Sequence, residues 1–205
     1  MNYIVIIDYG MGNLRSISNK FHKLNISAKV SSDHNEINNA NKLILPGVGH
    51  FKNGINNLKD RGLIELLNDM VLREKVPILG ICLGAQLFSN YSEEGNVCGL
   101  GWIDADTIRF KVSDTILFKI PHMGWNSVEI INKNDLDVEL EKSDLFYFVH
   151  SYHLKCNDKK LVWMKTVYDY EFVSAVRKEN IYGTQYHPEK SHDAGLKILK
   201  HFAEL

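Results

Sequence analysis

One cysteine of the chain lies in a pattern that is typical of a catalytic nucleophile. Residues 80–84 read Gly-Ile-Cys-Leu-Gly, and Cys82 stands between a run that predicts a strand and a segment that predicts a helix. Such an elbow presents the side chain on a sharp turn, and the free N–H groups at the helix start stabilise a thiolate. The N–H of Leu83 would donate to an oxyanion. A buried structural cysteine is the alternative interpretation.

A histidine and a glutamate near the end of the chain are the acid–base groups that a thiol nucleophile needs. Pro188 separates His187 from Glu189, and in an extended segment residues i and i+2 point to the same side. The imidazole would then act as the base, and the carboxylate would fix its tautomer. A His-x-Glu pattern is weak by itself, and a surface loop is the simpler interpretation unless the fold brings it to Cys82.

A glycine-rich turn is a second candidate source of oxyanion donors. Residues 46–49 read Pro-Gly-Val-Gly, and glycines allow a peptide N–H to face a developing oxyanion. An ordinary turn is the alternative. The other two of the three cysteines, Cys98 and Cys156, lack comparable surroundings. No Cys/His pattern has zinc-ligand spacing, so no metal is expected.

The elements that must position these residues alternate between strand and helix in the first half of the chain. Apolar runs predict strands at residues 3–8, 27–31, 42–45 and 77–81. Apolar side chains at helical spacing predict helices at residues 14–24, 63–71 and 85–91. This order indicates a parallel sheet covered on both faces. Asp8, Pro46 and Cys82 follow strand ends, so their loops should gather at one edge of the sheet, where sites form.

The second half of the chain is dominated by short strands. They are expected at residues 103–110, 127–131, 145–149, 161–167, 173–176 and 181–185, followed by a closing helix at residues 194–202. Antiparallel additions to the parallel core are therefore expected. No linker, repeat or low-complexity tract interrupts residues 1–205, which favours one domain.

The composition excludes several classes of protein. The 24 basic and 25 acidic residues leave a net charge of −1, so no basic surface for nucleic acid or an acidic membrane is expected. The longest apolar stretch, at residues 76–88, is shorter than the ~20 residues of a membrane helix. The sequence starts without a basic leader, and the odd cysteine count argues against a disulfide framework. We therefore expect a cytoplasmic protein.

Several motifs together resemble a known family over nearly the whole chain. Residues 80–86 with residues 187–189 resemble the active-site motifs of class I (triad) glutamine amidotransferases. Residues 8–16, 46–49, 121–126 (Pro-His-Met-Gly-Trp-Asn), 147–152 (Tyr-Phe-Val-His-Ser-Tyr) and 187–191 sharpen the resemblance. In this order they resemble the glutaminase subunits of imidazole glycerol phosphate synthase, which acts in histidine biosynthesis.

The resemblance implies a flavodoxin-like α/β fold and the hydrolysis of L-glutamine to glutamate and ammonia, without a cofactor. Cys82 would form a γ-glutamyl thioester, His187 would move the protons, and Glu189 would orient His187. The implied oxyanion hole consists of Gly47, Val48 and Leu83. The implied glutamine-binding residues are Gly49, Gln86, Glu94, Ser151 and Tyr152; for Glu94, a solvated loop acid is the alternative.

The resemblance also implies a partner, because the family's acceptor site is on a separate (β/α)₈ barrel cyclase. Ammonia would pass through that barrel, which makes imidazole glycerol phosphate and aminoimidazole carboxamide ribotide. The implied interface and ammonia-exit residues are Met123, Trp125, Asn126, Tyr147 and Lys190. Trp125 and Tyr147 could instead be plain core aromatics.

One departure from the family leaves the acceptor pathway open. Ala85 stands where the family often has methionine. The difference hints at a paralogous branch, whose members deliver ammonia to a cyclase-like partner in surface-polysaccharide sugar modification. Two other classes also compete with the glutaminase hypothesis: a cysteine hydrolase with a different substrate on the same fold, and a non-catalytic binding module.

Overall fold

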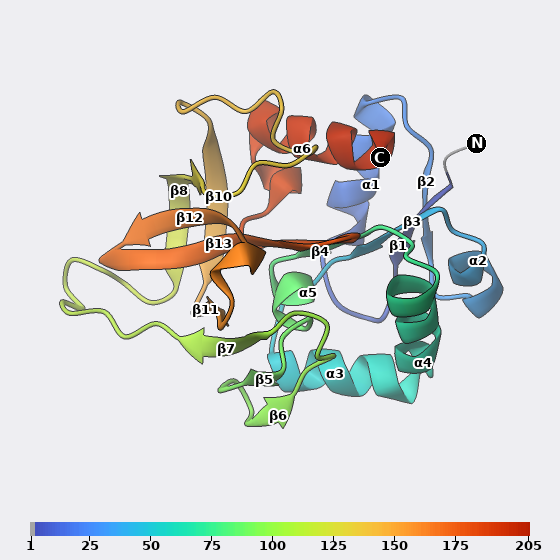
Figure 1. Cartoon of the computed structure of the whole chain (residues 1–205), viewed down its shortest axis with the longest axis horizontal. Coiled ribbons are helices and arrows are strands. Elements are labelled where there is room, and N and C mark those ends of the chain that lie inside the picture. Colours follow the sequence, from blue (N-terminus) through green and yellow to red (C-terminus); the bar gives the residue numbers. More distant parts are fainter. Residues whose placement is uncertain (1–2) are drawn as a thin grey trace.

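The computed structural model describes residues 3–205 and is built on a mixed β-sheet (Figure 1). The parallel part of the sheet has the strand order β2-β1-β3-β4-β14. These strands are β1 (Ile4–Ile7), β2 (Ala28–Ser31), β3 (Lys42–Leu45), β4 (Ile78–Ile81) and β14 (Ile181–Thr184). This is the flavodoxin-like order, so the predicted fold class is confirmed.

Mostly antiparallel strands extend the sheet beyond β14, as predicted, with one parallel pairing between β5 and β7. The order continues through β13 (Tyr170–Lys178), β11 (Tyr152–Cys156), β7 (Ala105–Arg109), β5 (Tyr91–Ser92) and β6 (Val97–Cys98). The strand β12 (Val162–Tyr168) pairs with β13 and with β9 (Glu129–Ile130). A separate antiparallel pair consists of β8 (His122–Ser127) and β10 (Leu145–His150).

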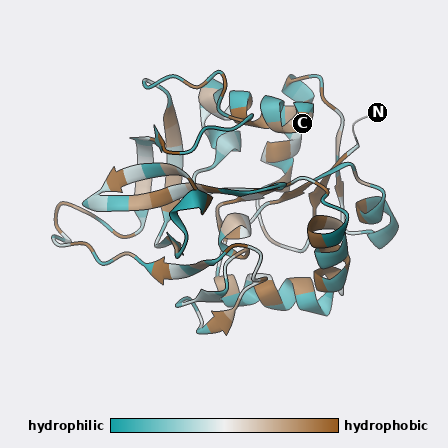
Figure 2. Cartoon of the chain, in the orientation of Figure 1, coloured by the Kyte–Doolittle hydropathy of each residue, from teal (hydrophilic) through white to brown (hydrophobic). Residues whose placement is uncertain are grey.

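Helices cover both faces of the parallel strands. In Figure 1, α1 (Leu14–Lys23) and α6 (His192–Glu204) lie above the sheet, and α3 (Phe51–Asp60) and α4 (Leu63–Asn68) lie below it. Successive side chains of β1 point to opposite faces of the sheet and so enter two separate apolar layers. Ile4 and Ile6 join one buried cluster, while Val5 and Ile7 join the other. Figure 2 shows the matching banding of hydrophobic and hydrophilic residues on these helices. No helix within residues 3–205 is long and apolar enough to cross a membrane.

Several elements differ from the sequence-based expectations. The helix expected at residues 85–91 is α5 (Leu83–Gln86), and the chain then turns into β5. The helix expected at residues 63–71 ends as α4 and continues as a π-helical turn, Asp69–Arg73. The predictions missed α2 (His34–Asn38), α3, β8 and β11. Asparagine and glycine are frequent in α2, α3 and β8, and their low intrinsic propensity hides elements that tertiary packing stabilises.

Candidate active site

The local fold around Cys82 is a strained strand-to-helix elbow. Cys82 has φ 54° and ψ −110°, a conformation that L side chains rarely adopt, and it directly precedes α5. A Cβ added at Gly84 would lie 1.9 Å from the Leu45 carbonyl oxygen, and one added at Gly80 would lie 2.6 Å from the Phe88 ring. Only glycine therefore allows strand and helix to approach this closely, as the motif predicted.

The residues expected to bind and cleave glutamine line one cavity of about 200 Å³ at the carboxyl end of β4. Its lining contains nine of them: Val48, Gly49, Cys82, Leu83, Gln86, Glu94, Ser151, Tyr152 and His187. Glu189 is buried behind His187, and Gly47 packs against the elbow. Segments that are far apart in sequence thus meet at the predicted sheet edge.

His187 and Glu189 are paired, although not for the reason that the sequence suggested. The segment Pro188–Lys190 is a 3₁₀ turn rather than an extended strand, and this turn brings Glu189 Oε1 to 2.8 Å from His187 Nδ1. Both side chains are only 1% exposed. Burial alone would lower the pKa of His187, but the charges and hydrogen bonds of Cys82 and Glu189 outweigh it and raise that pKa to about 10. The geometry favours the protonated form of His187.

The two candidate oxyanion donors flank the nucleophile. The Leu83 N–H is the first of α5 and has no intrahelical acceptor. Across the cavity, a Cβ at Gly47 would lie 2.7 Å from the Gly84 nitrogen, so the Pro-Gly-Val-Gly turn packs directly on the elbow. Gly49 has φ +126°, a backbone conformation that favours glycine. Tyr9 Oη donates to the Pro46 carbonyl at 2.7 Å and holds the turn from behind.

Gln86 and Glu94 line the cavity but also have structural partners. Gln86 Nε2 donates to the Tyr152 carbonyl and to Gln185 Oε1, each at 2.9 Å. Glu94 Oε2 accepts from the Phe51 N–H at 2.7 Å, at the start of α3. These two side chains are therefore fixed before any substrate enters.

Two polar residues to which the sequence analysis gave no role contact Cys82 and the backbone of His187. Gln185 Nε2 lies 3.6 Å from Cys82 Sγ. Ser191 Oγ donates to the His187 carbonyl at 2.6 Å and accepts from the Tyr147 N–H at 3.0 Å. Both residues flank the His-Pro-Glu motif, and their proximity to that motif was the one signal available.

Three of the five residues expected at a partner interface, Met123, Trp125 and Tyr147, lie on the outer side of β8 and β10. Met123 and Trp125 are 61% and 44% exposed, so the interpretation of Trp125 as a core aromatic is wrong. Tyr147 is half-buried, and its ring centroid lies 5.9 Å from that of Trp125. Lys190 Nζ lies over the Tyr147 ring, 5.4 Å from its centroid. Asn126 points to the other side of β8 and donates to the Val167 carbonyl.

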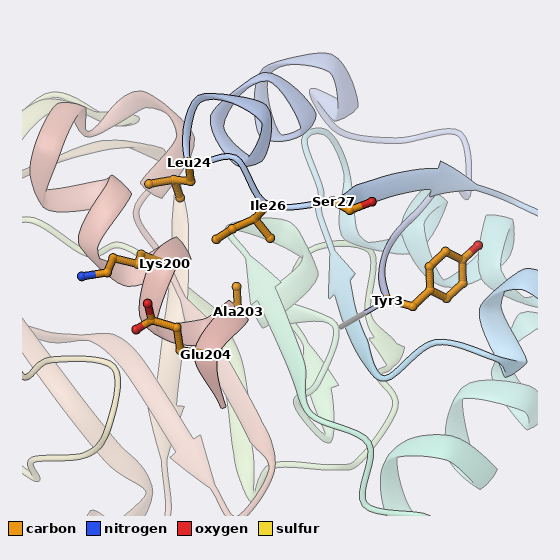
Figure 3. Close-up of a pocket in the computed structure, with 7 residues that line it drawn as sticks. All are labelled: Tyr3, Leu24, Ile26, Ser27, Lys200, Ala203 and Glu204. Carbon is orange, nitrogen blue, oxygen red and sulfur yellow. The ribbon is translucent and has the colours of Figure 1, made fainter. Parts of the chain in front are cut away.

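The remaining thiols and hollows lie apart from this site. Cys98 is exposed and Cys156 is partly buried, and neither lines the active-site cavity. A larger hollow of about 530 Å³ lies between the end of α6 and the start of β2 (Figure 3). Ile26 and Ala203 line it, and it contains none of the predicted catalytic side chains. Within residues 3–205 no three His, Cys, Asp or Glu side chains gather as metal ligands.

Fold and site together define a class of protein: an α/β enzyme with a cysteine on a strand-to-helix elbow and a buried His–Glu pair at the same cavity. The family model described as glutamine amidotransferase class-I matches residues 5–204. The chain belongs to the class-I glutamine amidotransferase family.

Similar proteins with known names narrow the family further. "Imidazole glycerol phosphate synthase subunit HisH 2" of Methanococcus maripaludis is 54% identical over 97% of this chain and 98% of its own. "Imidazole glycerol phosphate synthase subunit HisH 1" of Campylobacter jejuni is 45% identical over 98% of this chain and 100% of its own. The HisH subunit of Leptospira borgpetersenii is 43% identical over the same shares.

Solved structures agree on the fold. A structure described as "Crystal structure of glutamine amidotransferase" has a TM-score of 0.77 at 17% identity, covering 98% of this chain and 97% of that one. The PurLQS structure from Thermotoga maritima has a TM-score of 0.70, also at 17% identity and with the same coverage.

Proposed function

We propose that this chain is the glutaminase subunit of an imidazole glycerol phosphate synthase and hydrolyses L-glutamine to glutamate and ammonia. The observation that carries the proposal is the meeting of the Cys82 elbow and the His187–Glu189 pair at one small cavity. The HisH names of full-length relatives support the histidine pathway and do not favour the sugar-modification alternative. In this proposal Cys82, His187 and Glu189 are the catalytic triad.

The chemistry follows from these positions. The Cys82 thiolate attacks the side-chain amide carbonyl of glutamine, and the Leu83 N–H with the turn at Gly47 and Val48 stabilises the oxyanion. His187 protonates the leaving nitrogen, ammonia departs, and a thioester remains. His187 then takes a proton from water, which attacks the thioester and releases glutamate. Glu189 holds the Nδ1–H of His187 throughout.

Substrate binding is assigned to the walls of the same cavity. Gly49, Gln86, Ser151 and Tyr152 would contact the glutamine. The free oxygen of Glu94, whose other oxygen caps α3, would face the substrate ammonium. A cavity of about 200 Å³ suits a single amino acid better than a peptide or a nucleotide.

The ammonia would be used by a second subunit, a (β/α)₈ barrel cyclase. The exposed outer side of β8 and β10, with Met123 and Trp125, is an apolar surface of the kind that forms interface cores. Tyr147 and Lys190 lie beside it, and Asn126 would support it from the inner side of β8. The charge balance and lack of a membrane-spanning helix within residues 3–205 suit our proposal of a cytoplasmic heterodimer.

The test separates the making of ammonia from its use. In the complex with the barrel of the same organism, Cys82→Ala should abolish imidazole glycerol phosphate formation from glutamine and spare formation from added ammonia. Equal loss of both activities would contradict the assigned role. A wild-type chain that forms no complex and no product would contradict the histidine pathway. Failure of a glutamine-mimicking electrophile to label Cys82 would favour a hydrolase with another substrate.

A further inference from the structure

One backbone carbonyl anchors a hydrogen-bond network that runs away from the nucleophile. The Tyr152 backbone carbonyl oxygen accepts two hydrogen bonds, one from Gln86 Nε2 at 2.9 Å and one from His150 Nδ1 at 2.8 Å. A carbonyl can only accept, so both partners must donate. This requirement fixes the orientation of every group further along both branches.

The inner branch ends at the reactive sulfur. With Gln86 Nε2 fixed as a donor, its second N–H points to Gln185 Oε1 at 2.9 Å. The Gln185 amide oxygen is then the acceptor, so its nitrogen is the end that faces Cys82 Sγ, at 3.6 Å. Both glutamines are at most 4% exposed, which excludes competing water from their amides. The network therefore directs an N–H at the nucleophile.

The outer branch passes through two buried histidines. His150 and His122 are direct cross-strand partners on β10 and β8, and His122 Nδ1 lies 3.1 Å from His150 Nε2. If His150 is neutral and donates through Nδ1, its Nε2 accepts, so His122 must donate through Nδ1 as well. His122 Nε2 is then an acceptor, and the Asn126 amide nitrogen lies 3.5 Å from it.

Both histidines have surroundings that favour the neutral ring. Their exposed fractions are 3% for His122 and 5% for His150. Burial lowers the pKa of His122 to about 4 and lowers the pKa of His150 well below its usual value. The groups packed on them are aromatic, chiefly Phe148, Tyr168 and Phe172, and no carboxylate of residues 3–205 pairs with either ring.

The strands that carry the histidines also carry the exposed surface. On β8 and β10 alternate residues face opposite sides, so His122 and His150 lie inside while Met123 and Trp125 lie outside. A shift of this two-stranded sheet would therefore move both the outer surface and the inner histidine pair.

We propose that this network is a positioning device: Gln185 donates to the Cys82 thiolate, and a neutral, Nδ1-protonated His122–His150 pair holds the Tyr152 carbonyl that orients it. The inference rests on the proposed glutaminase function, but its first two tests need neither substrate nor partner, so they can fail or succeed independently of that function. Gln185 acts by stabilising the thiolate before attack, and the histidines act through the carbonyl.

The first experiment measures the tautomers directly. In the full-length wild-type chain at pH 7, the imidazole ¹⁵N chemical shifts should show Nδ1–H and an unprotonated Nε2 for both His122 and His150. Free histidine favours the Nε2–H tautomer, so this result is not the default. A neutral Nε2–H ring or an imidazolium at either position would overturn the outer branch.

The second experiment measures the reactivity of the nucleophile. At pH 7, Gln185→Glu places a carboxylate against the sulfur and should slow alkylation of Cys82 by chloroacetamide about tenfold, because a neighbouring negative charge disfavours the reactive anion. Gln185→Met keeps the volume without the donor and should slow it about threefold. Alkylation of exposed Cys98 in the same chains is the internal control. The titratable groups that face the sulfur are His187 and Tyr9, and both residues are retained in the two variants. Wild-type rates in both variants would overturn the inner branch.

A third measurement links the network to turnover. His122→Phe keeps the ring but loses the donor, and should raise the KM for glutamine about fivefold while leaving ammonia-dependent synthesis unchanged. His122→Asn retains a donor near the Nδ1 position and should restore the KM. His153→Phe removes a buried histidine of the same cluster that lies outside the network, and should leave the KM unchanged. Equal KM values in His122→Phe and wild type would contradict the coupling.

Discussion

At the scale of single residues, Glu189 is the side chain that orients the His187 ring. Glu189 Oε1 lies 2.8 Å from His187 Nδ1, and both are buried. Glu189→Gln removes the charge while keeping the shape, so the imidazole loses its orientation and one of the contributions to its raised pKa, although the larger ones come from Cys82. We expect glutamine-dependent kcat to fall about a hundredfold or more, with ammonia-dependent synthesis retained. Unchanged kcat would contradict the role of Glu189.

The two cysteines outside the active-site cavity, Cys98 and Cys156, should differ in reactivity because they differ in burial. Burial, reinforced by the charges of Asp104 and Asp158, raises the pKa of Cys156 to about 12. The folded chain therefore keeps this proton where the unfolded chain loses it, and stability falls as pH rises from about 9 to about 12. At pH 9, peptide-resolved alkylation should modify exposed Cys98 at least about a hundredfold faster than Cys156. Equal rates would show that Cys156 is not buried in solution.

At the scale of elements, the elbow depends on the close approach of β4, β3 and α5. A Cβ at Gly84 would meet backbone, the Leu45 carbonyl oxygen at 1.9 Å, which has no freedom to move aside. We expect Gly84→Ala to lower the free energy of unfolding by about 3 kcal/mol or more, measured by urea denaturation. Gly62→Ala is the control: φ is +66° and the new Cβ is 3.4 Å from its nearest neighbour, so the cost should be about 1 kcal/mol. Equal losses would contradict the steric argument.

At the scale of the whole molecule, the active-site cavity and the exposed aromatic surface lie on the same part of the chain. The Tyr147 carbonyl accepts the His187 N–H at 2.9 Å, so β10 connects the surface to the triad through one backbone hydrogen bond. A partner bound to the outer side of β8 and β10 would therefore contact the strand that supports the catalytic histidine.

Trp125 is the best candidate for an energetic centre of that surface. It is 44% exposed and stacks on His192 with 4.8 Å between ring centroids, so its ring is held in place before binding. Trp125→Ala should weaken association with the barrel subunit by about 2 kcal/mol, roughly thirtyfold in Kd, as measured by calorimetry. Leu72→Ala is the control. It removes a similarly exposed apolar side chain from the π-helical turn Asp69–Arg73, which belongs to neither β8 nor β10, and should leave Kd unchanged. A loss for Leu72→Ala alone would place the interface elsewhere.

Elements whose signal is local could be predicted, and elements that need tertiary support could not. The apolar runs of β1, β3 and β4 identified buried parallel strands because such strands are apolar on both faces. The helix α3 escaped prediction because Gly54 and its asparagines are poor helix formers. Its packing, in which Leu87 lies 3.1 Å from the position of a Gly54 Cβ, is not visible in sequence.

The sequence by itself determined the elbow at Cys82, because an elbow is made of adjacent residues whose glycines are needed for steric reasons. It also determined the family through motifs that occur in order. Only the tertiary structure decided that a 3₁₀ turn pairs His187 with Glu189, and that Gln185, His150 and His122 belong to one network. The reason is physical: the direction of an amide or an imidazole hydrogen bond depends on its acceptor. Here that acceptor, the Tyr152 carbonyl, lies on a strand that the sequence did not reveal.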